Sequence, residues 1–317
     1  MAKEQYILDI GHDYVTICHK GAIIREPSVA MVRQAKGKEL IASGKQAVEY
    51  MGEIEAFVTF VRPFSGGTIV DAEILSLMLN DILSKYIERA LFVGIEVIVA
   101  IPCGMTKVDK EVLESILAQI GFKFITFKEN ILAMQNYVES KPIMVAILGA
   151  STTDIGIIDS NGIVCASTID IGGRNIDRYI VSCVNSEYSV RISDKTAEYI
   201  KINAGSLYPN NKSVALVRGH DIFMNQKKDI AVSGETVAVA MASVFDRISD
   251  LINTTLIEAP ALSTEGITER GIYIFGGGAY TTGLQEYLYE KTGLIAKIDC
   301  DNQPELNVVT GLNAQLG

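Results

Sequence analysis

Apolar residues form two similar strand–turn–strand patterns, one at the start of the chain and one near its middle. In each pattern an apolar run is followed by a turn that begins with a glycine, Gly11 or Gly149, and then by a second apolar run. Runs of this kind separated by a short glycine turn predict hairpins. The predicted strands span 5–10, 15–19, 144–148, 153–158 and 163–168. Because the pattern recurs, we expect a distant internal duplication.

Elsewhere, apolar residues recur at steps of three and four, which is typical of amphipathic helices. The predicted helices span 71–88, 106–121, 175–184, 194–204, 235–256 and 282–291. Asp71 and Thr106 are suited to be the N-caps of the first two. Two apolar runs, 97–101 and 271–275, predict strands in the middle of a sheet. The alternation of strands and helices predicts an α/β fold with helices covering the sheets.

Length and charge narrow the class of protein. A chain of 317 residues suits two domains of roughly 150 residues each. The net charge of −10 and the absence of a Lys/Arg-rich stretch argue against a nucleic-acid partner. The five cysteines contain no CxxC pair, and the three histidines are scattered, so we expect reduced core thiols and no metal-ligand set.

The apolar stretches do not predict a membrane-spanning segment. The N-terminus has no apolar core of the kind found in signal peptides. The longest apolar stretch, 91–105, is interrupted by Gly94, Glu96 and Pro102 and is too short to cross a bilayer. We therefore expect a cytoplasmic protein whose contact with a membrane, if it has one, is peripheral.

Three glycine turns follow apolar strands, at Gly11, at 149–151 and at 276–278. Glycine lets a backbone approach a ligand closely, and its amide groups can point at phosphate oxygens. One such turn is usually only a turn. Three of them, two placed by the apparent duplication, predict a nucleotide-binding cleft between the two halves.

Several blocks occur in the order found in one family of bacterial actins. They are LDIG at 8–11, REPSV at 25–29, ASGKQA at 42–47, VRPFSGGTIVD at 61–71, IPCGMT at 101–106, TAEYIKI at 196–202, GS at 205–206, and ERG at 269–271 leading into GGGA at 276–279. Over nearly the whole length, the chain resembles the MreB family of bacterial actins. Ordered blocks are far more specific than any single glycine motif.

The resemblance implies an actin-like, ribonuclease H-like duplicated fold with two lobes and four subdomains, each lobe a mixed sheet flanked by helices. The expected first lobe is 1–138, with a small insertion at about 30–70. The second is 139–317, with a small subdomain at about 175–252 and a C-terminal helix that can return to the first lobe.

The resemblance also implies a function. ATP or ADP would bind in the central cleft, and head-to-tail contacts would build filaments that scaffold cell shape and cell-wall synthesis at the inner face of the cell membrane. The implied partners are further copies of the chain, other MreB-type actins, the inner-membrane cell-wall machinery and the membrane surface, without nucleic acid.

The resemblance also assigns residues of this chain to the family's nucleotide site. Gly276, Gly277 and Gly278 match the family's adenosine loop. Glu198 and Lys201, one helical turn apart, match a pair near the nucleoside; without the flanking blocks they would be an ordinary surface ion pair. The remaining cofactor-binding positions are Asp9 (also the candidate metal ligand), Gly11, Gly149, Thr152, Thr153, Gly172, Gly173 and Asp177.

The phosphate side departs from the family. His12 and Tyr14 replace small polar residues, and GAS at 149–151 replaces three glycines. Ile147 stands where the family has an acidic residue. Asn130-Ile131 stands in place of the Glu-Pro pair that orients water, with Glu129 one position away.

These replacements bear directly on hydrolysis. Mg²⁺ needs oxygen ligands, and phosphoryl transfer to water relies on the metal and a water-orienting group. Each lost group costs roughly a hundredfold in rate. We therefore expect weak or absent ATP hydrolysis, with nucleotide bound poorly or without Mg²⁺. Glu129, Thr152 and Thr153 remain as candidates for a catalytic role.

Leu91 and Phe92 align with an exposed apolar pair by which some MreB proteins enter the bilayer. Internal packing of the two side chains is an equal alternative.

Two functions stay open: a polymerising MreB-type actin, and a non-polymerising actin-fold pseudo-ATPase that regulates a partner. Other members of the superfamily match less well. A sugar kinase needs a catalytic base, for which no convincing residue is present, and a heat-shock chaperone needs a large extra domain. The cell-division actin FtsA has a different subdomain.

Overall fold

The computed structural model describes residues 4–34, 37–51, 57–87, 95–208, 210–264, 266–298 and 303–316. The chain divides into two compact units. Unit 1 comprises Met1–Tyr137 and Leu306–Gly317, and unit 2 comprises Val138–Glu305. Leu91 and Phe92, the expected membrane pair, lie outside the described residues.

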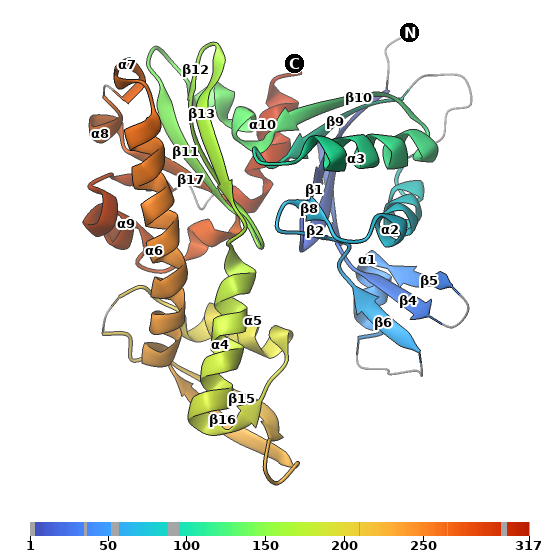
Figure 1. Cartoon of the computed structure of the whole chain (residues 1–317), viewed down its shortest axis with the longest axis vertical. Coiled ribbons are helices and arrows are strands. Elements are labelled where there is room, and N and C mark those ends of the chain that lie inside the picture. The colour runs from blue at the N-terminus through green and yellow to red at the C-terminus, as the bar shows by residue number, and fades with distance from the viewer. Residues whose placement is uncertain are drawn as a thin grey trace. The chain divides into compact units, whose positions relative to one another are not determined.

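Unit 1 is built on a mixed five-stranded sheet of order β10-β9-β1-β2-β3 (Figure 1). The central strand β1 pairs parallel with β9 and antiparallel with β2, whose other neighbour, β3, is also antiparallel. The bounds are β1 Glu4–Ile10, β2 Tyr14–His19, β3 Ala22–Pro27, β9 Ile95–Ile101 and β10 Phe122–Glu129. Helices α2 (Ala72–Ser84) and α3 (Lys107–Ile120) pack their apolar faces against one face of this sheet, where they share a hydrophobic core with it.

Both helices start as the sequence predicts. The Asp71 carboxylate accepts a hydrogen bond from the Ile74 amide, and the Thr106 hydroxyl accepts one from the Asp109 amide. These bonds satisfy N–H groups that a helix start leaves unpaired. The predicted end of α2 near Glu88 is wrong, because the helix stops at Ser84 and the chain turns at Lys85 and Tyr86.

Smaller elements complete unit 1. A three-stranded sheet of order β5-β4-β6 carries α1, and a two-stranded pair, β7-β8, follows it. The helix α10 returns to unit 1, where it packs against η1. The bounds are β4 Ala30–Gln34, β5 Lys38–Ser43, α1 Gly44–Glu49, β6 Val58–Val61, β7 Phe64–Ser65, β8 Thr68–Ile69, η1 Asn130–Tyr137 and α10 Asn307–Ala314.

Unit 2 repeats the sheet topology of unit 1. Its sheet has the order β13-β12-β11-β17-β18, with two antiparallel pairings on one side of β11 and two parallel pairings on the other. The bounds are β11 Ile143–Leu148, β12 Thr153–Asp159, β13 Gly162–Ile169, β17 Ile272–Phe275 and β18 Ala296–Ile298. The two sheets therefore show the duplication expected from the two hairpin patterns.

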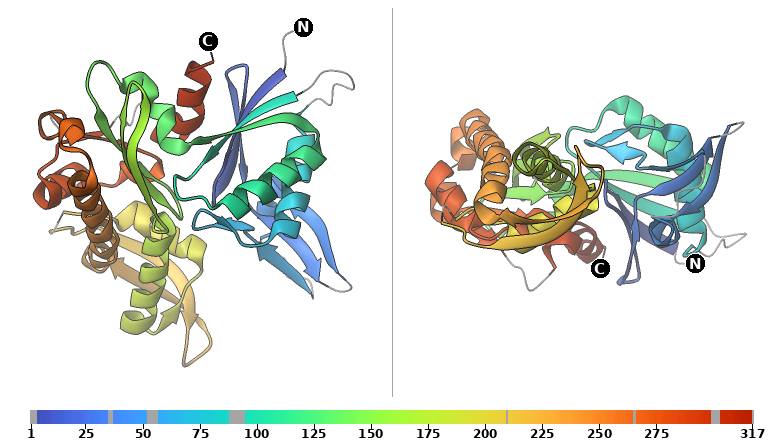
Figure 2. Two further views of the ribbon diagram at one scale, coloured as in Figure 1. Left: turned by 45° about the horizontal axis from the view of Figure 1, so that its top comes forward. Right: turned by 90° about the horizontal axis from the view of Figure 1, so that it is seen from below.

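The helices of unit 2 join this sheet to a small sheet of order β14-β15-β16. The longest, α6, packs against β12 and β13 and also against β16 (Figures 1 and 2). The helix bounds are α4 Gly173–Tyr188, α5 Asp194–Ala204, α6 Gly234–Glu258, α7 Ala261–Thr264, α8 Ile267–Arg270, η2 Gly277–Tyr280 and α9 Leu284–Thr292. The short η3, Pro304–Leu306, lies where the chain passes from unit 2 to unit 1. The strand bounds are β14 Val190–Arg191, β15 Val214–Asp221 and β16 Lys227–Ser233. Within the described ranges, none of the helices is long and apolar enough to cross a bilayer.

Candidate functional site

The turns of the two predicted hairpins close in the same way. The Gly11 amide donates to the Tyr14 carbonyl at 2.9 Å, and the Gly149 amide donates to the Thr152 carbonyl, also at 2.9 Å. A methyl group added at Gly149 would lie 2.8 Å from that carbonyl oxygen. Glycine at the first turn position is therefore a steric requirement of the second hairpin.

In unit 2, the start of α4 docks onto the second hairpin turn. The Gly173 amide donates to the Gly149 carbonyl at 3.1 Å, and the Arg174 amide donates to the Ala150 carbonyl at 2.7 Å. A methyl group at Gly172 would lie 2.5 Å from the Gly149 oxygen. The side chain of Thr153 belongs to this junction, because its buried hydroxyl donates to the Ile171 carbonyl.

The third glycine turn lies against the end of β11. Gly276 has a positive φ of 82°, and a methyl group there would lie 2.4 Å from the Leu148 oxygen. A methyl group at Gly278 would lie 2.6 Å from Leu148 Cβ, whereas one at Gly277 would meet nothing within 4 Å. The glycine turns at 149, 172–173 and 276–278 thus meet around the end of β11 in unit 2. Gly11 belongs to unit 1.

A buried carboxylate stands beside this junction. The Asp177 side chain is 2% exposed, and Lys201 Nζ lies 2.8 Å from its Oδ1 as an ion pair rather than as a well-aligned hydrogen bond. The Arg174 guanidinium lies 3.7 Å from Asp177 Oδ2, and Lys201 Nζ also donates a hydrogen bond to the Gly173 carbonyl. Burial raises the pKa of Asp177 against the lowering effect of Lys201 and Arg174, and Glu198 adds to the rise. Lys201 is therefore not half of an ordinary surface pair with Glu198, since it reaches inward from α5 to α4.

The sheet supplies a second acidic residue that sequence reasoning missed. Ile147 is buried and lies directly opposite Asp154 in the β11–β12 pairing. Directly opposed residues project to the same face of a sheet, so the Asp154 carboxylate stands next to Ile147. Thr168 donates a hydrogen bond to it. The signal was present in the sequence, because a four-residue turn at 149–152 fixes this register.

In unit 1, Arg62 holds the first hairpin turn. Its guanidinium donates to the carbonyls of His12, Ser28 and Asp13, at 3.0, 3.3 and 3.5 Å, and lies 3.5 Å from the Asp13 carboxylate. Asp9 is half-buried on β1, directly opposite Thr16 of β2. Sequence reasoning gave Arg62 no role, because nothing local to 61–71 indicates which carbonyls its side chain reaches.

His12 and Tyr14, which belong to this hairpin, make contacts within unit 1. His12 Nδ1 lies 3.1 Å from the Phe64 carbonyl. The exposed Tyr14 ring lies under the Arg25 guanidinium, 4.0 Å from its centroid. Both side chains therefore connect the turn to other segments of unit 1.

Glu129 ends β10, where it pairs with Ile101 at the end of β9. Its carboxylate lies 3.7 Å from Lys110 Nζ, which comes from α3. This ion pair joins the end of β10 to α3.

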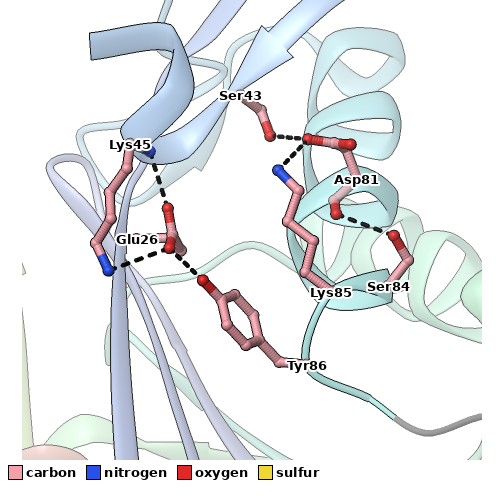
Figure 3. Close-up of polar contacts among 7 residues, drawn as sticks. All are labelled: Glu26, Ser43, Lys45, Asp81, Ser84, Lys85 and Tyr86. Carbon is pink, nitrogen blue, oxygen red and sulfur yellow. Dashed lines mark hydrogen bonds and ion pairs between the residues drawn. The ribbon is translucent and has the colours of Figure 1, made fainter. Parts of the chain in front are cut away.

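A separate polar cluster in unit 1 surrounds Glu26 of β3 (Figure 3). Its buried carboxylate accepts hydrogen bonds from the Tyr86 hydroxyl and the Lys45 amide, and Lys45 Nζ lies 3.3 Å away. Burial acts to raise the pKa of Glu26, but these partners together outweigh it and hold the pKa below its usual value. The same bond raises the pKa of Tyr86 to about 12. Beside it, Asp81 accepts hydrogen bonds from Ser43 and Lys85.

This cluster explains both a glycine and a helix end. Gly44 has a φ of +64°, and a methyl group there would lie 2.3 Å from a Glu26 oxygen. The Tyr86 hydroxyl donates its hydrogen bond to Glu26 from a position just after the end of α2. The cluster therefore ties β3, α1 and the segment after α2 together without lying in any glycine turn of the predicted site.

Comparison with known proteins identifies the family to which this chain belongs. The family model for MreB/Mbl protein matches residues 4–316. The cell shape-determining protein Mbl of Bacillus subtilis (strain 168) is 28% identical over 295 residues, which cover 89% of this chain and 88% of that protein. The cell shape-determining protein MreB of Escherichia coli (strain K12) is 27% identical over 300 residues, covering 90% of this chain and 86% of that protein.

Solved structures agree with this family. Crystal structures of Spiroplasma citri MreB5 bound to AMPPNP and to ADP each match with a TM-score of 0.89 at 27% identity, covering 99% of this chain and 96% of theirs. A MamK double helical filament, 16% identical with a TM-score of 0.80 and coverage of 98% and 99%, shares the fold. With two mixed five-stranded sheets flanked by helices and a family match over almost its entire length, this chain is an actin-fold protein that belongs to the MreB/Mbl family.

Proposed function

We propose that this protein is a filament-forming bacterial actin that binds ATP or ADP and helps to scaffold cell shape. The observation that carries the proposal is the meeting of three glycine turns at the end of β11, beside the Asp177–Lys201 pair. The relatives named for cell shape, the MreB5 structures with AMPPNP and ADP, and the MamK filament support it. We further propose a cytoplasmic location at the inner face of the cell membrane, with Leu91 and Phe92 as one contact.

The residues of unit 2 fit a nucleotide. At Gly277 the backbone is open on the side where other residues carry a Cβ atom, while Gly276 and Gly278 anchor the turn on Leu148. Such an arrangement lets a flat base approach the main chain. Lys201, held by Asp177, supplies a positive charge and hydrogen-bond donors for the nucleoside. Bound ATP would supply a phosphoanhydride bond, and the residues around its phosphates would determine how fast that bond is hydrolysed.

Hydrolysis is proposed to be weak. Ile147 offers no oxygen ligand, and the Thr153 hydroxyl already donates to Ile171. Asp154 is the one carboxylate beside Ile147 in the paired strands, and it is buried and bonded to Thr168. Phosphate release at saturating ATP and Mg²⁺, measured beside Escherichia coli MreB, is expected to be at least about tenfold slower. Equal turnover of the two proteins would refute weak hydrolysis.

Nucleotide binding is tested at Gly277. Gly277→Val adds a side chain on the open side of the turn, where a Cβ atom would meet nothing within 4 Å, so the fold should tolerate it. We expect the affinity for a fluorescent ATP analogue to fall about tenfold or more, with an unchanged melting temperature without nucleotide. Unaltered affinity would exclude this turn from the nucleotide site.

The second candidate is a non-polymerising regulatory module. The departures at Ile147, His12 and Tyr14 favour it. Sedimentation and negative-stain imaging with ATP, with ADP and without nucleotide separate the two functions, because only the first produces filaments. A particle that stays a monomer or dimer under all three conditions would replace the first function with the second.

A further inference from the structure

An arginine lies near the first hairpin turn, on the same face of the sheet as the candidate metal ligand. Asp9 of β1 lies directly opposite Thr16 of β2, and Thr16 lies directly opposite Arg25 of β3. Directly opposed residues project to one face of a sheet, so the three side chains form a row across it. The neighbouring residues Leu8 and Ile17 belong to the core shared with α2 and α3, so the row lies on the other face of the sheet.

The positive charge of Arg25 lies at the turn end of this row. Thr16 is buried, whereas Tyr14, two residues nearer the turn on the same strand, is 42% exposed. The central carbon of the Arg25 guanidinium lies 4.0 Å from the centroid of the Tyr14 ring. The Tyr14 carbonyl in turn accepts the hydrogen bond from the Gly11 amide. The charge is therefore held beside the Gly11 turn, at the part of this face that solvent reaches.

Two guanidinium groups accompany Asp9 and Asp13, the two carboxylates of the segment that forms this turn. Arg62 donates to main-chain carbonyls of the turn and lies 3.5 Å from the Asp13 carboxylate. Arg25 stands in the row of Asp9. Mg²⁺ is usually held by one or two carboxylates together with phosphates of the substrate. Here cations of the chain itself compensate the carboxylates, so the residues of the first hairpin fit a metal ion poorly. Across the described ranges, no group of three or more His, Cys, Asp or Glu side chains could hold one.

We propose that Arg25 binds the phosphates of ATP or ADP in place of Mg²⁺, so that the nucleotide binds about equally well with and without the metal. This role of Arg25 rests on the proposed function and specifies its phosphate side in unit 1. A guanidinium presents a planar fork of N–H donors that matches two phosphate oxygens, and it stays charged at all ordinary pH values. Packing on the Tyr14 ring restricts the side chain before the ligand arrives, which reduces the entropy lost on binding.

The affinity for a fluorescent ATP analogue, measured in excess Mg²⁺ and in excess EDTA, tests the proposal. For the unaltered chain, we expect the two dissociation constants to differ by less than about threefold. Arg25→Gln removes the charge and should bind about tenfold or more weakly in EDTA. In Mg²⁺ the same variant should bind almost normally, because the metal can then neutralise the phosphates beside Asp9.

Two further variants separate the charge of Arg25 from its place in the fold. Arg33→Gln makes the same change of charge on β4, where Arg33 pairs with Glu39 at the surface, and should leave both dissociation constants unchanged. Arg25→Lys keeps the charge without the planar fork, so its affinity should lie between those of the unaltered chain and Arg25→Gln and should stay independent of Mg²⁺. Melting temperatures without nucleotide check the fold of all three variants.

The possible failures are distinguishable. An unaltered chain that binds the analogue only with Mg²⁺ would overturn the role of Arg25 and leave the proposed function standing. An equal loss of affinity for Arg25→Gln in both buffers would assign the arginine a structural role in the hairpin and would also overturn the proposal. No binding to the unaltered chain in either buffer would refute nucleotide binding itself, and the role of Arg25 with it.

Discussion

A single carboxylate, Glu26, holds three segments of unit 1 together. Its two oxygens accept hydrogen bonds from the Tyr86 hydroxyl and the Lys45 amide, and a methyl group at Gly44 would lie 2.3 Å from one of them. Removing one donor from a buried acceptor costs about 1–3 kcal/mol, because the acceptor loses a partner that water cannot replace. Tyr86→Phe should therefore lower the free energy of unfolding by that amount at neutral pH. An unaltered urea midpoint would show that the bond contributes nothing.

The same bond predicts a dependence on pH at both ends of the scale. The pKa of Glu26 is lowered in the folded state, so its contribution is complete above the unfolded value of about 4.3 and is lost as pH falls through the folded pKa. The pKa of Tyr86 is raised to about 12, so its contribution is complete below about pH 10 and is lost as pH rises toward 12.

Urea unfolding of the unaltered chain and of Tyr86→Phe across these ranges measures the effect. The stability difference between the two should stay constant from about pH 6 to 9 and shrink between pH 10 and 12. A difference that grows with pH in that window would contradict the assignment.

Two glycines of unit 2 make a matched pair for steric effects. Gly172→Ala would place a methyl group 2.5 Å from the Gly149 oxygen, whereas at Gly277 the methyl group would meet no atom within 4 Å. We expect Gly172→Ala to destabilise the protein by about 1–3 kcal/mol and Gly277→Ala to change stability by less than about 0.5 kcal/mol. Thermal unfolding of both without nucleotide checks the prediction, which fails if the two changes are equal.

At the scale of elements, the segments with strong local signals were predictable. The strand–turn–strand hairpins, α5 and the capped start of α3 follow from periodicity, glycine turns and capping residues in their own windows. The end of α2 was not, since Tyr86 leaves the helix for Glu26, sixty residues earlier in the chain. Lys201 beside Asp177 was missed for the same reason. Both contacts depend on how separate elements pack, which no single window contains. Asp154 beside Ile147 follows from the register of one local hairpin and could have been predicted.

The cap of α3 gives a test at this scale. The Thr106 hydroxyl accepts the Asp109 amide and donates to the Asp109 carboxylate. Thr106→Ala should cost about 1 kcal/mol of unfolding free energy. Lys107→Ala, which removes an exposed side chain paired with Glu111, is the control and should cost less than about 0.5 kcal/mol. Equal effects of the two substitutions would show that the cap does not stabilise the helix.

For the whole molecule, the distinctive feature is that unit 1 is assembled from both ends of the chain. Gly311 of α10 approaches η1 so closely that a methyl group would lie 2.1 Å from the Ala133 oxygen. Gln315 adds hydrogen bonds to Lys128 and to the Leu132 carbonyl. The C-terminal helix is thus fastened by backbone contact and side-chain bonds together.

Gly311→Val should therefore loosen unit 1 in particular. We expect a loss of about 2 kcal/mol or more, and faster cleavage by protease within η1 than within unit 2. Gln315→Ala, which keeps the backbone contact, should have a smaller effect. Cleavage first in unit 2 would contradict the prediction that α10 stabilises unit 1 in particular.

The origin of unit 1 in both ends of the chain also sets an order of events on the ribosome. Residues 138–305 form a continuous unit, whereas the first 137 residues lack α10 until the last part of the chain has been made. At ordinary elongation rates that interval is about 10–30 s. Through it, the face of η1 that α10 covers in the finished protein is left without its partner helix.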